Sequence, residues 1–403
     1  MAGQILRLEQ AQSLLLDRVK KIEETEVIPL WDAAGRVLAE DIFAGHDQPP
    51  FPRSPLDGYA VRSEDIAKAS KECPVRLTVI DEVNAGYVSR RCVTSGTAVR
   101  IMTGAPIPKG ADCVVGQEDT DYGEAVAEFY EAIGAYENYC YAGEDYKAGT
   151  KLLSKDMALG SVEAGILASL GLKQVKVYRR PRVAVLTTGD EILLPGETLL
   201  EGKIYDSNLY TLVTRLTTLG MNVVRTGRLG DDAKDVAAWI EETKKQADII
   251  VTTGGVSVGK KDIMHDVVNR LGCERIFWRV AVKPGMPTLC AQYQGGLLIC
   301  LSGNPFGAAV NFELLVRPLL GKMSQKKELM LKRSQAVSQS TFPKKSTVDR
   351  YVRAYYEDGK VRIPKGSNAS GILSSMCGCN CLIELPAGTP RLSEGDRVWV
   401  ILL

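Results

Sequence analysis

A glycine-rich turn between a short apolar run and a helix-like segment holds the residues best suited to chemistry. The run Ile249–Val251 is typical of a strand buried on both faces, and Ile263–Leu271 is typical of a helix. The turn between them contains hydroxyls and glycines: Thr252, Thr253, Gly254, Gly255, Ser257 and Gly259. Glycines let a phosphate approach backbone N–H groups, and a helix N-terminus favours an anion. The stretch therefore predicts an anion site.

The same turn ends in a carboxylate, Asp262. A carboxylate beside an anion is repulsive unless it caps the helix or holds a cation, and the spacing leaves both roles open. The glycine pattern matches neither the P-loop nor the dinucleotide-binding fingerprint, which argues against a standard NTPase or dehydrogenase.

The surrounding sequence alternates apolar runs with helix-like segments, so it predicts one doubly wound parallel sheet. Four polar turns follow its strands: Gly189–Glu191, Asp231–Asp232, Thr253–Gly255 and Gly303–Pro305. Ligands of such sheets bind beyond the carboxyl ends of the strands. We therefore expect these turns to converge on one edge.

Convergence would bring three carboxylates next to the glycine turns: Glu191, Asp231 and Asp262. That combination indicates an anion bound together with a divalent cation, and hard oxygen ligands favour magnesium over zinc. Arg279 and Lys283 are candidates to neutralise phosphate or oxyanion charge, and solvated surface is the alternative interpretation for both.

Segments before the sheet must help to position this site. The apolar spacing from Leu8 to Ile22 predicts an amphipathic helix that runs to about Glu24. Four prolines between Gln48 and Val61 predict a stiff, extended path, for which a plain domain-boundary linker is the alternative to a functional role. Short β-rich runs from about Val75 to Tyr146 predict a small β domain.

The sequence after the sheet, Ser334–Leu403, is rich in short β runs and glycine turns, which predicts a small sandwich or barrel. Its main polar candidates are Arg350, Arg353 and the segment Ser367–Ser375. Serines in a turn-rich segment are usually turn residues, so their role stays open.

The totals exclude several classes of protein. A chain of 403 residues is too long for one typical core, so about two to four domains are expected. A formal net charge of +1 gives no global field for nucleic acid or an acidic membrane. No apolar run approaches the length of a membrane span, and the N-terminus shows no secretion signal. We predict a cytoplasmic protein without nucleic-acid or membrane partners.

Ten cysteines are scattered along the chain, which is typical of reduced thiols rather than of a disulfide framework. Cys377, Cys379 and Cys381 alternate, which would place all three on one face of a strand. A metal site and a set of small buried side chains are both open, although zinc sites usually use longer paired spacings.

Six short motifs occur in a fixed order: SPLDGYA (54–60), IMTGAP (101–106), TGDE (188–191), TGGVSVG (253–259), KPG (283–285) and GNP (303–305). Together they resemble the molybdopterin molybdenumtransferases, which include bacterial MoeA, the E-domain of the plant molybdenum insertase and the gephyrin E-domain. The resemblance covers nearly the whole chain, and the order of the motifs makes it specific.

The resemblance implies an α/β multidomain fold with three regions. These are an N-terminal region of residues 1–177, which contains a proline-rich linker segment and a β-rich subdomain at about 47–146, a doubly wound molybdopterin-binding domain at 178–325, and a small β-barrel at 330–403. It also implies an enzyme that inserts molybdenum from molybdate into adenylylated molybdopterin and releases AMP, assisted by Mg²⁺.

The family pattern assigns roles to individual residues. Catalytic roles fall on Asp57, Thr103, Glu191, Asp231 and Asp262, and the last three are the expected metal ligands. Cofactor binding falls on Thr188, Gly189, Thr253, Gly254, Gly255, Ser257, Lys283, Ser302, Gly303, Asn304 and Pro305. Arg279, Arg353 and Ser375, together with Lys283, match positions that the family uses around the oxyanion. Family members are homodimers, so we expect Asp57 and Thr103 to reach the sheet domain of a second subunit.

Two residues differ from the family pattern, and three alternative functions are open. Ser302 replaces a proline that is common in the family, and Leu56 replaces a common methionine. A tungstate-inserting relative, a non-enzymatic cofactor-binding scaffold and the preceding adenylylating enzyme are the alternatives. The adenylylating enzymes typically lack the Asp57 segment and the C-terminal β module. The expected protein partners are molybdopterin adenylyltransferase and apo-molybdoenzymes, with hand-over of the cofactor between them and this protein.

Overall fold

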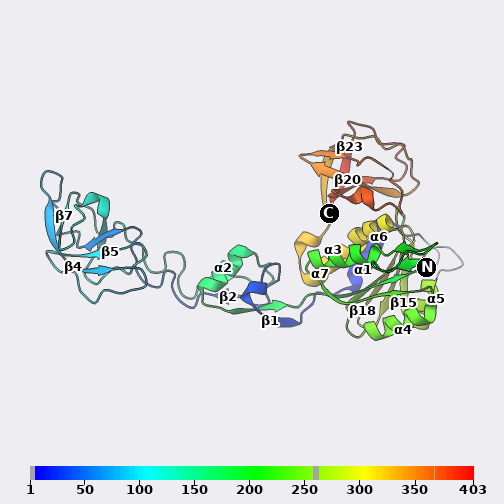
Figure 1. Cartoon of the computed structure of the whole chain (residues 1–403), viewed down its shortest axis with the longest axis horizontal. Coiled ribbons are helices and arrows are strands. Elements are labelled where there is room, and N and C mark those ends of the chain that lie inside the picture. The colour runs from blue at the N-terminus through cyan, green and yellow to red at the C-terminus, as the bar shows by residue number, and fades with distance from the viewer. Residues whose placement is uncertain (1–4, 257–262, 367) are drawn as a thin grey trace. The chain divides into compact units, whose positions relative to one another are not determined.

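The computed structural model describes residues 5–256, 263–366 and 368–403 (Figure 1). Its contacts divide the chain into two compact units. The first contains the N-terminal segment as far as Ala39, Ala158–Gly160 and Lys176–Leu403. The second contains Glu40–Met157 and Ser161–Val175. The predicted boundaries 1–177, 178–325 and 330–403 remain predictions, because these units follow contacts rather than family domains.

A six-stranded sheet organises the first unit. In spatial order its strands are β13 (Asn222–Leu229), β10 (Arg182–Thr188), β14 (Ile249–Thr253), β18 (Gly296–Leu301), β17 (Leu289–Tyr293) and β15 (Glu274–Trp278). The first four are parallel, whereas β17 and β15 run antiparallel to their neighbours. The sheet is mixed because β17 and β18 are joined across Tyr293 and Gly296 by a tight hairpin, which can only join antiparallel strands.

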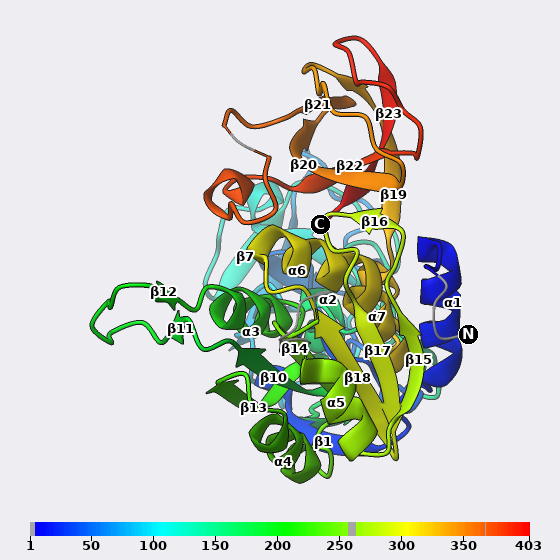
Figure 2. The same ribbon diagram turned by 90° about the vertical axis from the view of Figure 1, so that its right-hand side faces the viewer.

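Helices cover both faces of this sheet, which confirms the doubly wound prediction (Figures 1 and 2). One face carries α1 (Leu8–Arg18), α3 (Asn208–Thr218), α6 (Pro305–Asn311) and α7 (Arg317–Ser324), and the other carries α4 (Ala233–Thr243) and α5 (Ile263–Arg270). Alternate residues of β10 serve the two cores, because successive strand side chains point to opposite faces. Val183 and Val185 pack in one core, and Ala184 and Leu186 in the other.

The N-terminal helix is shorter than predicted. It ends at Arg18, and Val19 adopts an extended backbone. The N–H of Ile22 then donates to the carbonyl oxygen of Met323 at 2.9 Å instead of continuing the helix. Val19 and Ile22 are nevertheless buried in the core of the sheet domain, so the apolar spacing continues beyond the helix itself.

A small closed β-barrel forms the C-terminal part of the first unit, as predicted. In order its strands are β16 (Val282–Lys283), β20 (Asp349–Glu357), β21 (Lys360–Arg362), β19 (Lys332–Ser338), β23 (Arg397–Leu402) and β22 (Cys381–Leu385). A β20–β22 pairing closes the last five into a ring, and β16 is attached to β20 outside it. The strand β16 comes from the sequence of the sheet domain. It pairs Val282 with Asp349 and Lys283 with Arg350, and thereby attaches the barrel to the sheet domain.

The cysteine cluster does not share a strand face, so that prediction is wrong. Only Cys381 lies in a strand, β22, and Ser374–Met376 forms a short 3-10 turn before it. Gly378 has a φ of 76°, which breaks the extended backbone that alternation requires. Among the described residues, no group of three or more histidine, cysteine or carboxylate side chains is arranged to hold a metal ion.

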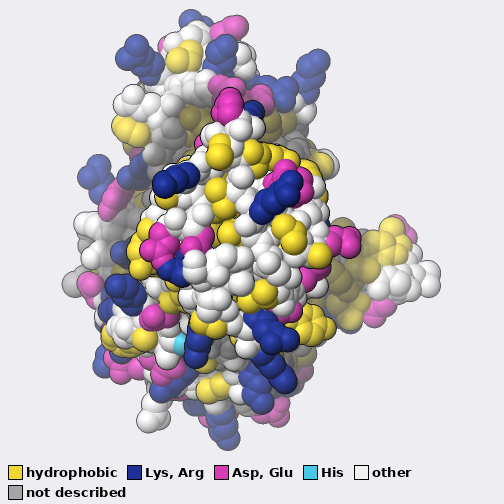
Figure 3. Space-filling view, turned by 90° about the vertical axis from the view of Figure 1, so that its left-hand side faces the viewer, with side chains coloured by type: hydrophobic (Ala, Val, Ile, Leu, Met, Phe, Trp, Pro, Cys, Tyr) yellow, Lys and Arg dark blue, Asp and Glu magenta, His cyan; other side chains and the backbone are white. Residues whose placement is uncertain are grey.

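The second unit is β-rich, as predicted. Its five-stranded sheet has the order β6 (Cys113–Gly116), β3 (Gly58–Val61), β5 (Thr97–Ile101), β4 (Val75–Val83) and β7 (Val126–Phe129). The proline-rich segment leads directly into β3, and β2 (Ile42–Phe43), β8 (Lys151–Leu153) and α2 (Ser161–Ser169) complete the unit. Figure 3 shows basic, acidic and hydrophobic side chains mixed on the face toward the viewer.

The remaining short strands are β1 (Thr25–Pro29), β9 (Gln174–Tyr178), β11 (Ile192–Leu193) and β12 (Ile204–Tyr205). A π-helical segment, Phe312–Val316, joins α6 to α7. Across residues 5–256, 263–366 and 368–403, no helix has the length and apolar character needed to cross a membrane.

A buried carboxylate anchors the amino-terminal edge of the main sheet. Asp248 accepts hydrogen bonds from Arg179 at 2.7 and 3.0 Å, and from the backbone N–H and side chain of Arg182 at 2.7 and 3.1 Å. Burial raises the pKa of Asp248, but these hydrogen bonds outweigh burial and leave the pKa below its ordinary value. Arg179 also pairs with Glu24 at 2.6 Å, which ties the segment after α1 to this edge.

Asp248→Asn should lower the free energy of unfolding at neutral pH by about 3 kcal/mol, because it breaks a largely buried ion pair and leaves Arg179 with only its exposed charge partner, Glu24. A depressed carboxylate pKa stabilises the fold above the ordinary aspartate range, and that stability is lost as pH falls through the folded-state pKa. The variant and the wild type should therefore converge in acid. Urea unfolding at pH 7 and pH 3 measures this.

The control is Glu24→Gln, which removes an exposed partner of the same arginine and should cost less than about 1 kcal/mol. Equal stability of Asp248→Asn and wild type at pH 7 would contradict the role given to this carboxylate.

Candidate active site

The carboxyl ends of the parallel strands open onto a cavity of about 1130 Å³. The predicted turns meet there, and the structure brings together Thr188, Gly189, Glu191, Asp231, Thr253, Gly254, Gly255, Ser302, Gly303, Asn304 and Pro305. Lys283 lines the same cavity from β16. The convergence follows from the parallel sheet, since all four strands present their carboxyl ends on one edge.

Close backbone contact forms the floor of this cavity. Gly254 has a φ of +95°, and a Cβ on it would lie 2.2 Å from the carbonyl oxygen of Thr188. The Thr188 hydroxyl donates to the carbonyl oxygen of Thr253 at 3.4 Å, which joins the ends of β10 and β14. Only glycine fits at this position, and its lack of a side chain leaves the backbone open to an anion.

The acidic side of the cavity is organised by a neighbour of the predicted residues. The Asp190 carboxylate accepts the backbone N–H of Asp231 at 3.1 Å and so positions the Asp231 turn. Asp232, rather than Asp231, caps α4 by accepting the N–H groups of Lys234 and Asp235 at 2.7 and 3.2 Å. These backbone bonds lower the pKa of Asp232. Of these two adjacent aspartates, Asp232 caps the helix and Asp231 lines the cavity.

Sequence reasoning missed Asp206, a buried carboxylate in the cavity wall. It accepts the backbone N–H of Leu209 at 2.9 Å and the hydroxyl of Thr187. Nearby, the Asn208 side chain donates to the carbonyl oxygen of Gly303 at 2.8 Å and links α3 to the second glycine turn. The available signal was an aspartate before a helix, which is indistinguishable from an ordinary N-cap.

The barrel supplies the opposite wall. Phe342, Lys344, Arg350 and the segment 368–373 line the cavity, apart from Ile372. The pairing of β16 with β20 sets Lys283 directly beside Arg350. Lys344 was not predicted, and Arg350 was named only as a polar candidate of the C-terminal region.

Three residues predicted to lie around the oxyanion do not line the cavity among the described residues: Arg279, Arg353 and Ser375. Arg353 is fully buried, donates to the carbonyl oxygens of Ala369 at 2.8 Å and Ile372, and packs 3.7 Å from the ring centre of Phe306. Burial lowers the pKa of this guanidinium.

Arg279 lies 4.2 Å from the ring centre of Trp278, and the Ser375 carbonyl accepts the thiol of Cys379 at 3.4 Å.

Two predicted site residues, Ser257 and Asp262, lie outside the described residues. Their roles in anion and metal binding remain predictions. Glu191 and Asp231 are the predicted metal ligands that the structure brings to one cavity.

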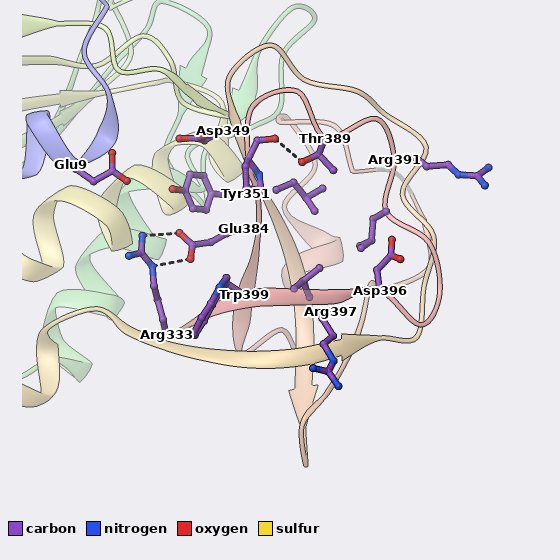
Figure 4. Close-up of a pocket in the computed structure, with 14 residues that line it drawn as sticks. Glu9, Arg333, Asp349, Tyr351, Glu384, Thr389, Arg391, Asp396, Arg397 and Trp399 are labelled. Carbon is purple, nitrogen blue, oxygen red and sulfur yellow. Dashed lines mark hydrogen bonds and ion pairs between the residues drawn. The ribbon is translucent and has the colours of Figure 1, made fainter.

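A second cavity, of about 840 Å³, lies on the barrel beside α1 (Figure 4). Its lining includes Glu9, Arg333, Glu384 and Trp399, and none of the predicted site residues. Arg333 pairs with Glu384 at 2.8 Å, so the central charges of this cavity are neutralised within the chain. These charges do not suit it to a polyanionic ligand.

The second unit holds the remaining predicted pair. The Asp57 carboxylate accepts both the backbone N–H and the hydroxyl of Thr103, each at 2.7 Å. The hydroxyl bond is the main cause that lowers the pKa of Asp57, and the backbone bond adds to it. Gly58 permits this arrangement, because a Cβ there would lie 1.9 Å from the carbonyl oxygen of Val115. Asp57 is therefore a fixed carboxylate that is ionised at neutral pH.

The chain matches three domain families along its length. The MoeA N-terminal region (domain I and II) matches residues 6–171, the probable molybdopterin binding domain matches 184–322, and the MoeA C-terminal region (domain IV) matches 335–403.

Relatives match the chain almost end to end. A molybdopterin molybdenumtransferase of Bacillus subtilis is 37% identical over 391 residues, which cover 95% of the chain and 91% of the relative. One from Haemophilus influenzae is 35% identical and is covered to 98%, as is this chain. The crystal structure of a molybdopterin biosynthesis MoeA protein from Pyrococcus horikoshii aligns with a TM-score of 0.80 and 32% identity, over 99% of this chain and 100% of that one. The chain thus belongs to the molybdopterin molybdenumtransferase family.

Proposed function

We propose that this protein inserts molybdenum from molybdate into adenylylated molybdopterin, releases AMP and forms molybdenum cofactor. One observation carries the proposal: the four turns of the sheet meet in a single cavity, in a chain that matches all three MoeA regions. A volume of about 1130 Å³ suits a nucleotide-linked pterin, since sites for small ligands usually span about 300–1000 Å³.

The cavity offers different groups to different parts of this substrate. Backbone N–H groups of the Thr253–Gly255 and Gly303–Asn304 turns are suited to the phosphate oxygens. Lys283 can neutralise oxyanion charge, and Ser302 adds a hydroxyl where the family proline offers none. AMP release requires cleavage of the phosphoanhydride, and these groups stabilise the charge that develops on the departing phosphate.

Magnesium is the proposed cofactor. Glu191 and Asp231 line the cavity with hard oxygen donors, and Mg²⁺ typically binds one or two carboxylates together with substrate phosphates. The donor chemistry therefore fits the ion, with Asp262 as a further proposed ligand. Bound Mg²⁺ would polarise the phosphoanhydride.

A homodimer with a shared site is the proposed assembly. An apolar arm, residues 192–205, projects from the sheet domain beside the cavity (Figure 2). Its Leu199, Leu200 and Ile204 are 57%, 56% and 57% exposed. Large apolar side chains gathered on one surface mark an interaction site. A second copy docked there would offer a route for its Asp57 and Thr103 to the cavity edge.

We also propose a cellular compartment and protein partners. All ten cysteines are free thiols, which supports a reducing, cytoplasmic setting. The proposed protein partners are molybdopterin adenylyltransferase and apo-molybdoenzymes, with hand-over of the cofactor between them and this protein. Tungstate insertion is the second candidate for oxyanion choice, and a scaffold role is not favoured, because the catalytic motifs are complete.

Purified protein should release AMP from adenylylated molybdopterin only when molybdate and Mg²⁺ are both present, and a chelator should abolish release reversibly. Glu191→Gln and Asp231→Asn should each lower the rate about 100-fold or more, since each removes a charge from the reacting centre.

Asp232→Asn is the matched control, because that residue caps α4 and should leave the rate unchanged. AMP release that is indifferent to molybdate would refute insertion, and the same assay with tungstate decides the oxyanion.

Thr103→Val should raise the pKa of Asp57, because the variant loses the hydroxyl donor but keeps the backbone N–H. An Asp57 carboxylate that must be ionised would then lose activity at higher pH on the acid side of the rate profile. Carbon-13 NMR titration of the carboxyl group measures the pKa, and AMP release measures the profile. Thr103→Ser retains the hydroxyl and should behave as wild type; an unchanged profile in Thr103→Val would argue against Asp57.

Charging the apolar arm should dissociate the dimer. Leu200→Glu combined with Ile204→Glu places two carboxylates where burial is proposed, so sedimentation velocity should show a monomer with reduced AMP release. Val337→Glu, an exposed position on β19, is the control and should remain dimeric. A dimeric arm variant would exclude the arm as the interface.

A further inference from the structure

Two buried arginines on β20 differ in what surrounds them. The terminal nitrogens of Arg353 donate to the carbonyl oxygens of Ile372 and Ala369, and its guanidinium packs on the ring of Phe306. Arg350 is 9% exposed, and its Nε, like that of Arg353, has no hydrogen-bond partner among the described residues. The two positions are three residues apart, so their side chains leave opposite faces of the strand. Only Arg350 lines the cavity.

No described carboxylate pairs with Arg350. Its guanidinium carbon lies 5.5 Å from the ring centre of Phe342. Burial alone lowers the pKa of Arg350, with no nearby acid acting to raise it. A buried cation without a partner is costly unless a ligand completes it. The terminal nitrogens of Arg353 bind two carbonyl oxygens, whereas no such partner is found for Arg350 among the described residues, and its place in the cavity wall suits it to an anion.

The acidic and the basic residues that line the cavity come from different parts of the fold. Its described carboxylates, Glu191, Asp206 and Asp231, all come from the sheet side. Its described cations are Lys283, which pairs across the ladder with Arg350, and Arg350 and Lys344 of the barrel. Residues directly opposite in a ladder share a face, so Lys283 and Arg350 point the same way. One wall is thus cationic and the other is anionic.

We infer that Arg350, beside Lys283 and Lys344, forms a subsite for a doubly charged oxyanion on the barrel wall. The planar guanidinium suits two oxygens of a tetrahedral anion, which a lysine cannot match in geometry. The chemistry fits either free molybdate or the diphosphate of the adenylylated pterin. This inference rests on the proposed function for its choice of ligands, and it adds a binding residue that lies outside the six family motifs.

A purely structural Arg350, held by stacking on Phe342, would behave differently. Its removal would weaken the fold, as removal of Arg353 should. An anion-binding Arg350 carries an uncompensated charge in the free protein, so replacing it should leave stability unchanged or higher while affinity falls. A structural role therefore predicts that stability and anion affinity both fall in the variant. An anion-binding role predicts that affinity falls while stability does not.

The test uses full-length wild type, Arg350→Gln, Arg350→Lys and the control Arg362→Gln. Arg362 is an exposed arginine of the same barrel that lies over Tyr355 and outside the cavity. Calorimetry with sodium molybdate and with inorganic pyrophosphate measures affinity, and thermal unfolding measures stability. Arg350→Gln should weaken one or both anions by about 10- to 100-fold, the range for a charged hydrogen-bond partner.

Arg350→Lys should lose less, and Arg362→Gln should match wild type. Selective loss of molybdate assigns the subsite to the free oxyanion, and selective loss of pyrophosphate assigns it to the diphosphate. The inference fails if the wild type binds neither anion, if Arg350→Gln binds both normally, or if its affinity and unfolding temperature fall together. AMP release is measured separately, so a subsite without turnover would refute the proposed function alone.

Discussion

Everything in the cavity depends on how closely two parallel strands approach at their carboxyl ends. Gly254 stands where any side chain would strike the Thr188 carbonyl, so the turns after β10 and β14 meet backbone to backbone. That contact exposes N–H groups instead of side chains and leaves the cavity floor open to anions. The acidic turns at Glu191 and Asp231, and the Gly303 turn after β18, are then set around the floor by the sheet itself.

Sequence reasoning performed well where periodicity dictates geometry. A buried parallel strand has one carboxyl end, so the turns at Glu191, Asp231, Thr253 and Asn304 had to share an edge. The barrel and the β-rich unit were equally readable from short alternating runs. The antiparallel pair β17 and β15 was not anticipated, because the tight hairpin after Tyr293 lies inside an otherwise helix-and-strand pattern.

It performed less well where the outcome depends on which side a residue faces. Arg350 and Arg353 are alike in type and neighbourhood, yet a three-residue step reverses the face of a strand. The family pattern names Arg353, whose role near the oxyanion remains a prediction, whereas the residue of this pair that lines the cavity is Arg350. Asp206 was hidden for a different reason: a carboxylate before a helix has an ordinary structural use, and only the fold shows that this residue also lines the cavity.

The two-residue strand β16 makes the barrel something other than a detachable module. Val282 and Lys283 precede α6 and α7 in sequence but pair with β20 of the barrel, outside the ring that the β20–β22 pairing closes. Cutting the chain between the sheet domain and the barrel would leave β20 without this added strand, and it would remove Lys283 from its place beside Arg350. A barrel separated from the sheet domain would therefore lack the Lys283–Arg350 pair on its cavity wall.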